Sequence, residues 1–130
     1  MIKVENLKKA FGAKYAVNGV SFNVERGEVL GFLGPNGAGK STTMRMLTGF
    51  ITPSSGSAQV MGFDVVRQPI EVKRRVGYLP EGAPLYGDMT VLAFLRFVAE
   101  MRGLEGEDGK RRMDAAIGRT QLEEVAHRPI

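Results

Sequence analysis

The sequence of 130 residues contains no cysteine and a single histidine. Without cysteine the chain can form no disulfide bond, no thiolate zinc site and no thiol nucleophile, and one histidine is too few for a histidine-rich metal site. Any metal ion that the chain binds should therefore be held by oxygen ligands.

Long apolar runs are also missing. The best candidate, residues 91–95, ends at Arg96 and is far shorter than the roughly 18 residues that a membrane-spanning helix needs. The first ten residues contain four charged side chains, and they lack the apolar core and the small-residue cleavage site of a secretory signal. We therefore expect a cytoplasmic chain with no membrane span.

The charge balance gives little support for nucleic acid as a partner. The formal net charge of +4 is compatible with polyanions, but the basic residues are spread out and form only short clusters at 73–75 and 110–112. The aromatic residues that interleave with basic ones in single-strand binders are missing. We expect both clusters on solvated helix faces.

A composition of 43% hydrophobic and 25% charged residues predicts a folded domain rather than disorder. Apolar positions up to Phe11, and again from Val17 to Val24, predict two strands that form a hairpin. The continuous apolar run 29–33 predicts a strand buried on both faces of a parallel sheet. Residues 40–48 predict a helix, with Gly49 as its C-terminal cap.

The glycine-rich stretch between this expected strand and helix carries the strongest functional signal. It has the glycine, lysine and hydroxyl spacing of a phosphate-binding loop. Its glycines let successive backbone amides point inward, and the helix start adds partial positive charge. The lysine reaches the β- and γ-phosphates, and the serine hydroxyl can ligate Mg²⁺. The loop consists of Gly34, Pro35, Asn36, Gly37, Ala38, Gly39, Lys40 and Ser41.

The alternative interpretation is a glycine-rich turn that binds nothing. The flanking strand and helix favour phosphate binding over this alternative. A guanine-specific GTPase would need an Asn-Lys-x-Asp element, which the sequence lacks, and here an antiparallel-looking segment of 33 residues precedes the loop. With these features, essentially the whole chain resembles the ATP-binding-cassette (ABC) family.

The resemblance implies an α/β fold. It comprises a P-loop NTPase core with an N-terminal antiparallel β subdomain and part of a helical subdomain. We expect a partial ATP-binding domain over 1–130, in which 1–87 contain the core and antiparallel segments and 88–130 begin the helical subdomain. A further strand at 57–61 belongs to the expected antiparallel sheet.

The same resemblance implies how adenine is bound. Residues 7–12 resemble the aromatic loop of the family, which makes Phe11 the platform on which adenine stacks. Tyr15 is a rival for this role, and packing of Phe11 in the core is the structural alternative. Ala16 stands where the family places a small residue against adenine and ribose, and Thr42 where it offers a second hydroxyl to the phosphates.

Glu81 stands where the family carries a glutamine that touches Mg²⁺ and the attacking water. The resemblance therefore assigns Glu81, with Ser41, as a metal ligand, and Glu81, with Lys40, as catalytic. An ionised carboxylate ligates magnesium but cannot donate a hydrogen bond, so the orientation of the water is open. A solvated loop glutamate is the alternative. With Glu81 in place of glutamine, and with Pro80 and residues 84–86 around it, this segment resembles the branch of the ABC family that contains drug, antibiotic and polysaccharide exporters.

The C-terminal third should be helical. Helical spacing of apolar residues predicts a helix over 90–104, capped by Asp88 or Thr90. Glycines at 106–109 should interrupt the pattern before helices at 110–117 and 121–126. In the family this region presses on a membrane partner, so the surface around Leu85 and Tyr86 is a candidate docking patch. Core packing of Val91, Leu95 and Val98 is the competing interpretation.

Three family features are absent: the Leu-Ser-Gly-Gly signature, the apolar strand ending in Asp-Glu, and the switch histidine. The tail 122–130 resembles the stretch just before that signature, so we expect a C-terminally truncated chain. His127 would then be a surface residue. The loss of a strand beside 29–33 should leave an apolar edge and a marginally stable or sticky fragment.

The resemblance implies the ATP-binding subunit of an ABC transporter, peripheral on the inner face of the cell membrane. It would bind ATP and Mg²⁺, pair with a second ABC ATPase domain as a homo- or heterodimer, and drive export through a membrane-spanning permease subunit. The alternatives are a soluble ABC ATPase that acts on ribosomes or DNA, and a nucleotide-binding fragment without turnover.

Overall fold

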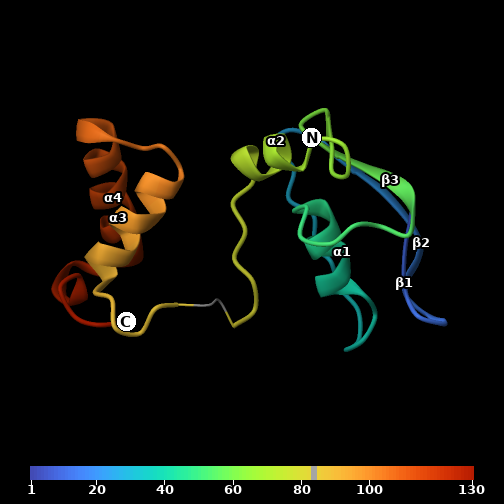
Figure 1. Cartoon of the computed structure of the whole chain (residues 1–130), viewed down its shortest axis with the longest axis horizontal. Coiled ribbons are helices and arrows are strands. Elements are labelled where there is room, and N and C mark those ends of the chain that lie inside the picture. The colour runs from blue at the N-terminus through green and yellow to red at the C-terminus, as the bar shows by residue number, and fades with distance from the viewer. Residues whose placement is uncertain (83–84) are drawn as a thin grey trace. The chain divides into compact units, whose positions relative to one another are not determined.

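The computed structural model describes residues 1–82 and 85–130, and they form two compact units (Figure 1). The first unit is Met1–Tyr78 and the second is Leu79–Ile130. The boundary between the units follows Tyr78, whereas the sequence predicts a domain division after residue 87; that division stays a prediction.

An antiparallel sheet forms the first unit, with its strands in the order β2-β1-β3-β4. The predicted hairpin is confirmed, and the strand predicted at 57–61 is found slightly earlier. Apolar side chains of the strands bury one face of the sheet: Val20, Phe22 and Val24 alternate with exposed residues, whereas register shifts interrupt this alternation nearer the turn. The strands are β1 (Ile2–Phe11), β2 (Lys14–Val24), β3 (Ser55–Val60) and β4 (Phe63–Asp64).

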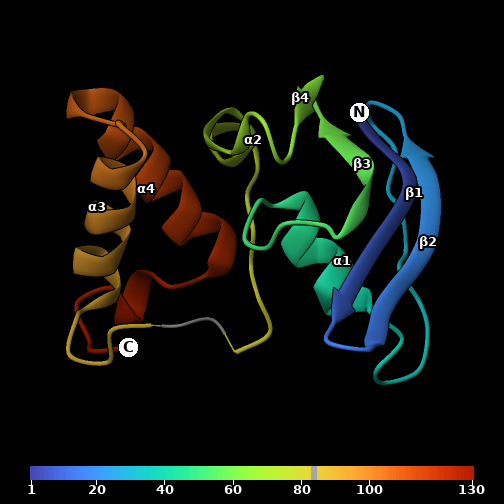
Figure 2. The same cartoon turned by 45° about the vertical axis from the view of Figure 1, so that its right-hand side comes forward.

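Two helices cover this face. The first, α1 (Lys40–Leu47), contacts β2 and β3, and Figure 2 shows it beside the sheet. It confirms the predicted helix and ends with Thr48 as its cap and Gly49 at a positive φ of 70°. The second is α2 (Pro69–Arg75). The largest core side chains that are less than 2% exposed are Leu7, Met46, Val72 and Thr43.

The sequence does not predict α2 as an element, but it places the basic cluster 73–75 on a solvated helix face, and this is confirmed. Arg74 and Arg75 both form ion pairs with Glu71, at 2.9 and 2.6 Å. The helix begins at Pro69. Proline suits this position because an N–H in the first helical turn has no acceptor within the helix, so its absence costs nothing.

The prediction of a buried strand at 29–33 is wrong. In the described residues this segment has no strand partner, and Val29 and Leu33 are 95% and 93% exposed. A strand needs a neighbour to satisfy its backbone groups, and the described strands pair only with one another. Phe32 is the exception to this exposure, because its ring packs edge to face on Phe22 of β2 with the centroids 5.3 Å apart.

The second unit is helical. Thr90 caps α3 by accepting a hydrogen bond from the Ala93 N–H at 3.1 Å, so Thr90 rather than Asp88 is the cap. The predicted break at 106–109 is wrong, because these residues begin α4. The predicted third helix is a short 3₁₀ turn, η1. The bounds are α3 (Val91–Met101), α4 (Gly106–Thr120) and η1 (Glu123–Val125).

Backbone contacts join the start of α3 to the C-terminal tail of the second unit. A bridge joins Thr90 to Pro129, and the N–H groups of Val91 and Leu92 donate to carbonyls of the tail at 3.2 and 2.9 Å. Gly109 packs so close to the Leu104 carbonyl that a Cβ would lie 2.5 Å from the oxygen. This contact explains why a glycine is tolerated inside α4. Among the residues that the structure describes, no helix combines the length and apolar character needed to cross a bilayer.

The second basic cluster, 110–112, lies on the exposed face of α4, as predicted. Arg111 and Arg112 both form ion pairs with Asp108, and these pairs lower the pKa of its carboxyl. Each cluster thus forms ion pairs with a carboxylate just before it in the sequence, Glu71 or Asp108, which offsets part of its charge and further weakens the case for a polyanion-binding surface.

Candidate phosphate-binding site

The glycine-rich loop leads directly into α1, whose first turn begins at Lys40. The N-cap is Gly39, and no side chain caps this end of the helix in the part of the chain that the structure describes. Gly37 and Gly39 have φ values of 85° and 89°, a region that residues with a Cβ adopt only under strain. The uncapped helix start therefore presents backbone N–H groups and partial positive charge, which suits an anion.

The loop is seated on β2 through Ala16. Ala16 is the extra residue of a β-bulge, because Val17 and Tyr15 pair with consecutive residues of β1. A Cβ at Gly39 would lie 2.3 Å from the Ala16 carbonyl oxygen and 2.9 Å from the Val17 side chain. Because backbone cannot move aside as a flexible side chain can, Gly39 is required for this close approach.

Lys40 is held at the mouth of the loop. Its Nζ donates hydrogen bonds to the carbonyl oxygens of Gly34 and Pro35, at 2.6 and 2.8 Å. The ammonium thus lies over the loop rather than out in solvent. Ser41 is exposed and Thr42 half-buried on the same turn, so both hydroxyls lie at the surface of the site.

Thr43 anchors the turn from below. Its side chain is 1% exposed, and both its N–H and its hydroxyl donate to the Gly39 carbonyl, at 2.8 and 2.9 Å. The other loop positions, Pro35, Asn36 and Ala38, are exposed. Sequence reasoning did not single out Thr43; a hydroxyl residue at the fourth position of a helix, facing the core, is the signal that could have identified it.

The register of the hairpin separates the two candidate adenine platforms. Phe11 pairs with Lys14, and Tyr15 pairs with Ala10. Consecutive pairs point to opposite faces of a sheet, so the two rings lie on different faces. Both are exposed, at 57% and 55%, which excludes core packing for Phe11. Only one ring can therefore serve a nucleotide whose phosphates lie in the loop.

The same hairpin carries Phe11 and contacts the glycine-rich loop. Phe11 is opposite Lys14, and about 7 Å of β2 separates Lys14 from Ala16, the residue that approaches Gly39. A rigid two-stranded element thus fixes both the aromatic ring and the phosphate loop.

The remaining predicted residues belong to the second unit. Glu81 is exposed in a turn, and its assignment as a magnesium ligand stays a prediction. His127 is on the surface, as expected. Leu85 and Tyr86 are 51% and 58% exposed, and the Tyr86 ring contacts Phe94 and Phe97 of α3. Pro84 lies outside the described residues.

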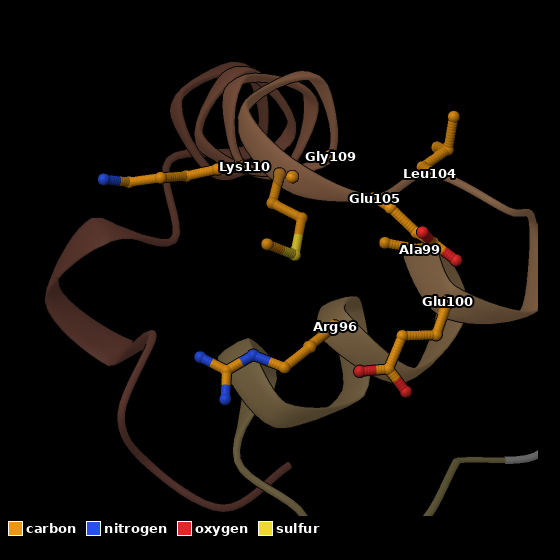
Figure 3. A pocket seen from close by; sticks show the side chains of 9 residues that line it. Arg96, Ala99, Glu100, Leu104, Glu105, Gly109 and Lys110 are labelled. Atoms are coloured by element: carbon orange, nitrogen blue, oxygen red, sulfur yellow. The ribbon is translucent and has the colours of Figure 1, made fainter.

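The helix face predicted as core is only partly buried. Val91 and Leu95 are half-buried, and Val98 is 37% exposed. A pocket of about 350 Å³ lies between α3 and α4 (Figure 3). Side chains of both charge signs line this pocket, and its lining includes none of the residues predicted to bind the nucleotide. The charged residues are Arg96, Glu100, Glu105 and Lys110.

A glycine-rich loop that leads into α1 and packs against an antiparallel sheet is the arrangement expected of a P-loop domain of the cassette type. The ABC transporter family model matches residues 17–130, and the chain belongs to this family. The predicted family and fold class are therefore confirmed.

Curated relatives agree with this assignment. The chain is 38% identical over 126 residues to the linearmycin resistance ATP-binding protein LnrL of Bacillus subtilis (strain 168), an alignment that covers 97% of this chain and 40% of the relative. It is 41% identical over 121 residues to the probable multidrug ABC transporter ATP-binding protein YbhF of Escherichia coli (strain K12), covering 91% and 21%. These names fit the predicted similarity to exporters. The chain spans less than half the length of both relatives.

Solved structures share the fold. A structure described as the ATP binding subunit of an ABC transporter superposes with a TM-score of 0.86 at 31% identity, covering 98% of this chain and 53% of that one. The dimeric ATP-binding cassette MJ0796 bound to ADP and Pi has a TM-score of 0.83 at 21% identity, covering 99% and 61%, and shows the fold alone.

Proposed function

We propose that this chain binds the triphosphate of Mg·ATP at the start of α1 and belongs to the ATP-binding subunit of an ABC exporter. One observation carries the proposal: an uncapped helix start follows a loop whose glycines have positive φ and whose lysine lies over it. Such a loop offers backbone N–H groups and one ammonium to phosphate oxygens.

The residues of the proposed site have separate chemical roles. Lys40 neutralises charge on the β- and γ-phosphates, and it needs only a small movement of its ammonium because it already lies at the loop. The amides of the first turn of α1 bind phosphate oxygens. Phe11 stacks on adenine from the end of β1, and Ala16 fits against the nucleoside.

The oxygen donors of the site suit magnesium. Ser41 exposes a hydroxyl on the first turn of α1, next to the amides that would bind phosphate. Bound Mg²⁺ would neutralise phosphate charge during phosphoryl transfer. Glu81 is our second candidate ligand, because a carboxylate oxygen is a ligand that Mg²⁺ prefers.

The proposed partners follow from the relatives' names and from the family. We propose that the whole protein pairs with a second cassette and with a membrane-spanning permease, at the inner face of the membrane. ATP binding would then close the two cassettes, and hydrolysis would reset them. Turnover by the intact protein, with Lys40 and Glu81 in the catalytic site, belongs to the same proposal.

Isothermal titration of the 130-residue chain with Mg·ATP tests the site. We expect saturable binding by the wild type and a loss of roughly tenfold or more in Lys40→Ala, because a charge-assisted contact to phosphate contributes about 1.5–3 kcal/mol. Lys8→Ala, a lysine on β1 outside the loop, is the matched control and should bind as the wild type does. Equal affinities for wild type and Lys40→Ala would reject the proposed site.

A further inference from the structure

One cation near the aromatic platform has no role in the proposed function. Lys9 is half-buried on β1, two residues before Phe11. Its Nζ lies over the Phe11 ring, 5.2 Å from the centroid, and donates a hydrogen bond to the Thr52 carbonyl oxygen at 2.7 Å. Lys9 therefore connects the exposed ring to the segment that leads from α1 to β3.

That segment is itself fixed to the end of β1. The Ser54 N–H donates to the Lys8 carbonyl at 2.8 Å, and the Ser54 hydroxyl accepts from the Ala10 N–H at 3.0 Å. These bonds hold the Thr52 carbonyl at a defined place beside the strand. The ammonium of Lys9 is consequently not a freely moving surface charge, because its acceptor is part of an anchored backbone.

The position of the ammonium determines how the ring can be used. An exposed phenylalanine at a strand end has no hydrogen-bonding group to fix its orientation, and Phe11 is 57% exposed. A cation over one face of the ring restrains it through attraction to the π-electrons. It also occupies that face, so a flat base has the opposite face available for stacking.

We propose that Lys9 is a positioning residue for base recognition: by holding one face of Phe11 and the Thr52 carbonyl together, it presents the other face of the ring to the base of the nucleotide. This inference rests on the proposed function, since it concerns the base end of the same nucleotide. Lys9 acts through Phe11 and contacts no phosphate, so its contribution is confined to ligands that carry a base.

Titration of the 130-residue chain with two ligands tests the proposal. Mg·ATP has a base, and inorganic tripolyphosphate with Mg²⁺ has only the phosphates. Lys9→Met removes the charge and keeps the length of the side chain. We expect Lys9→Met to weaken ATP binding by about 2- to 5-fold, the size of an exposed cation–π contact, and to leave tripolyphosphate binding unchanged. Lys9→Arg should retain most of the ATP affinity, because a guanidinium also stacks on a ring.

Phe11→Ala completes the test. It should weaken ATP binding by roughly 5-fold or more without affecting tripolyphosphate, and the double variant Lys9→Met/Phe11→Ala should bind ATP no more weakly than Phe11→Ala alone. Lys8→Met removes the same charge from the neighbouring position and should have no effect on either ligand. Unchanged tripolyphosphate affinity also shows that the variants are folded.

Three results would overturn the proposal. Equal losses for both ligands in Lys9→Met would mean that Lys9 binds phosphate directly. Losses that add in the double variant would mean that Lys9 and Phe11 act separately. If Lys9→Met left the ATP affinity unchanged, Lys9 would have no role in base recognition. Failure of the proposed function is a different result, in which Lys40→Ala binds both ligands as the wild type does.

Discussion

The two compact units bury their apolar side chains to different degrees. In Met1–Tyr78, Leu7, Met46 and Val72 are fully buried at 0% exposure. In Leu79–Ile130 the buried apolar residues are Ala99 at 6%, Ala126 at 6% and Ile117 at 9%, two of which are small. Larger residues of α3 stay partly exposed, Val98 at 37% and Met101 at 73%.

The difference shows where the chain can support precise chemistry. A binding site needs side chains held by packing, and the phosphate loop belongs to the unit that has such a core. The second unit relies more on backbone contacts, such as those between the start of α3 and the tail. We therefore expect its opening to cost less free energy than that of the first unit.

The largest expected effect is in the core of the first unit. Leu7→Ala should destabilise Met1–Tyr78 by about 2–5 kcal/mol, because it leaves a cavity at a fully buried position. In the second unit, Val98→Ala should cost about 1 kcal/mol or less, since the side chain is partly solvated as well as smaller. Hydrogen exchange read by mass spectrometry measures both. Equal effects would remove the contrast between the units.

Two glycines of the loop provide the next comparison. Gly37→Ala and Gly39→Ala both place a Cβ at positive φ, which costs about 1–2 kcal/mol. At Gly37 there is open space, whereas at Gly39 the Cβ meets the Ala16 carbonyl. We expect Gly39→Ala to be the more destabilising in a urea titration and the only one of the two to abolish ATP binding. Similar results for both would contradict the seating of the loop on β2.

Removing the cap of α3 should have a smaller effect. Thr90→Ala deletes the hydroxyl that accepts from the Ala93 N–H, at a cost of about 1 kcal/mol. Faster amide exchange confined to α3 would confirm the expectation. Asp88→Ala is the control and should leave α3 as it is. If Asp88→Ala were the more damaging variant, the cap would be wrongly assigned.

The smallest effect concerns the ion pairs of α2. Hydrogen bonding to Arg75, helped by Arg74, lowers the pKa of Glu71 below its ordinary value. A lowered pKa means that the pairs stabilise the folded state above the ordinary value of about 4.3 and lose this contribution as the pH falls through the lowered pKa. Glu71→Gln should therefore lower the Tm slightly at pH 7, and the difference from the wild type should shrink as the pH falls below about 4.3. A Tm difference that stays constant across this acid range would mean that the charge is not responsible.

Local patterns predicted much of this fold. The strands β1 and β2, the helices α1 and α3, and the loop before α1 follow from periodicity, glycine placement and capping residues near in sequence. The family resemblance indicated Phe11 and Ala16, and the register now places Phe11 and Tyr15 on opposite faces. That distinction depends on strand pairing, which no single segment specifies.

The failures have different physical causes. The run 29–33 has strand composition, yet a strand forms only where a partner is available. Glycines at 106 and 109 predicted a break, but Gly109 allows α4 to approach the Leu104 carbonyl. The helix α2 was missed because its seven residues contain too few apolar positions to show helical periodicity.

The central claim is that the backbone amides at the start of α1 bind a triphosphate. The most direct measurement is a ¹H–¹⁵N correlation spectrum of the 130-residue chain during titration with Mg·ATP. We predict that the largest, saturable shifts come from the amides of residues 37–42 and that those of α4 barely move. Saturable shifts that spare 37–42, or the absence of any saturable shift, would contradict the account.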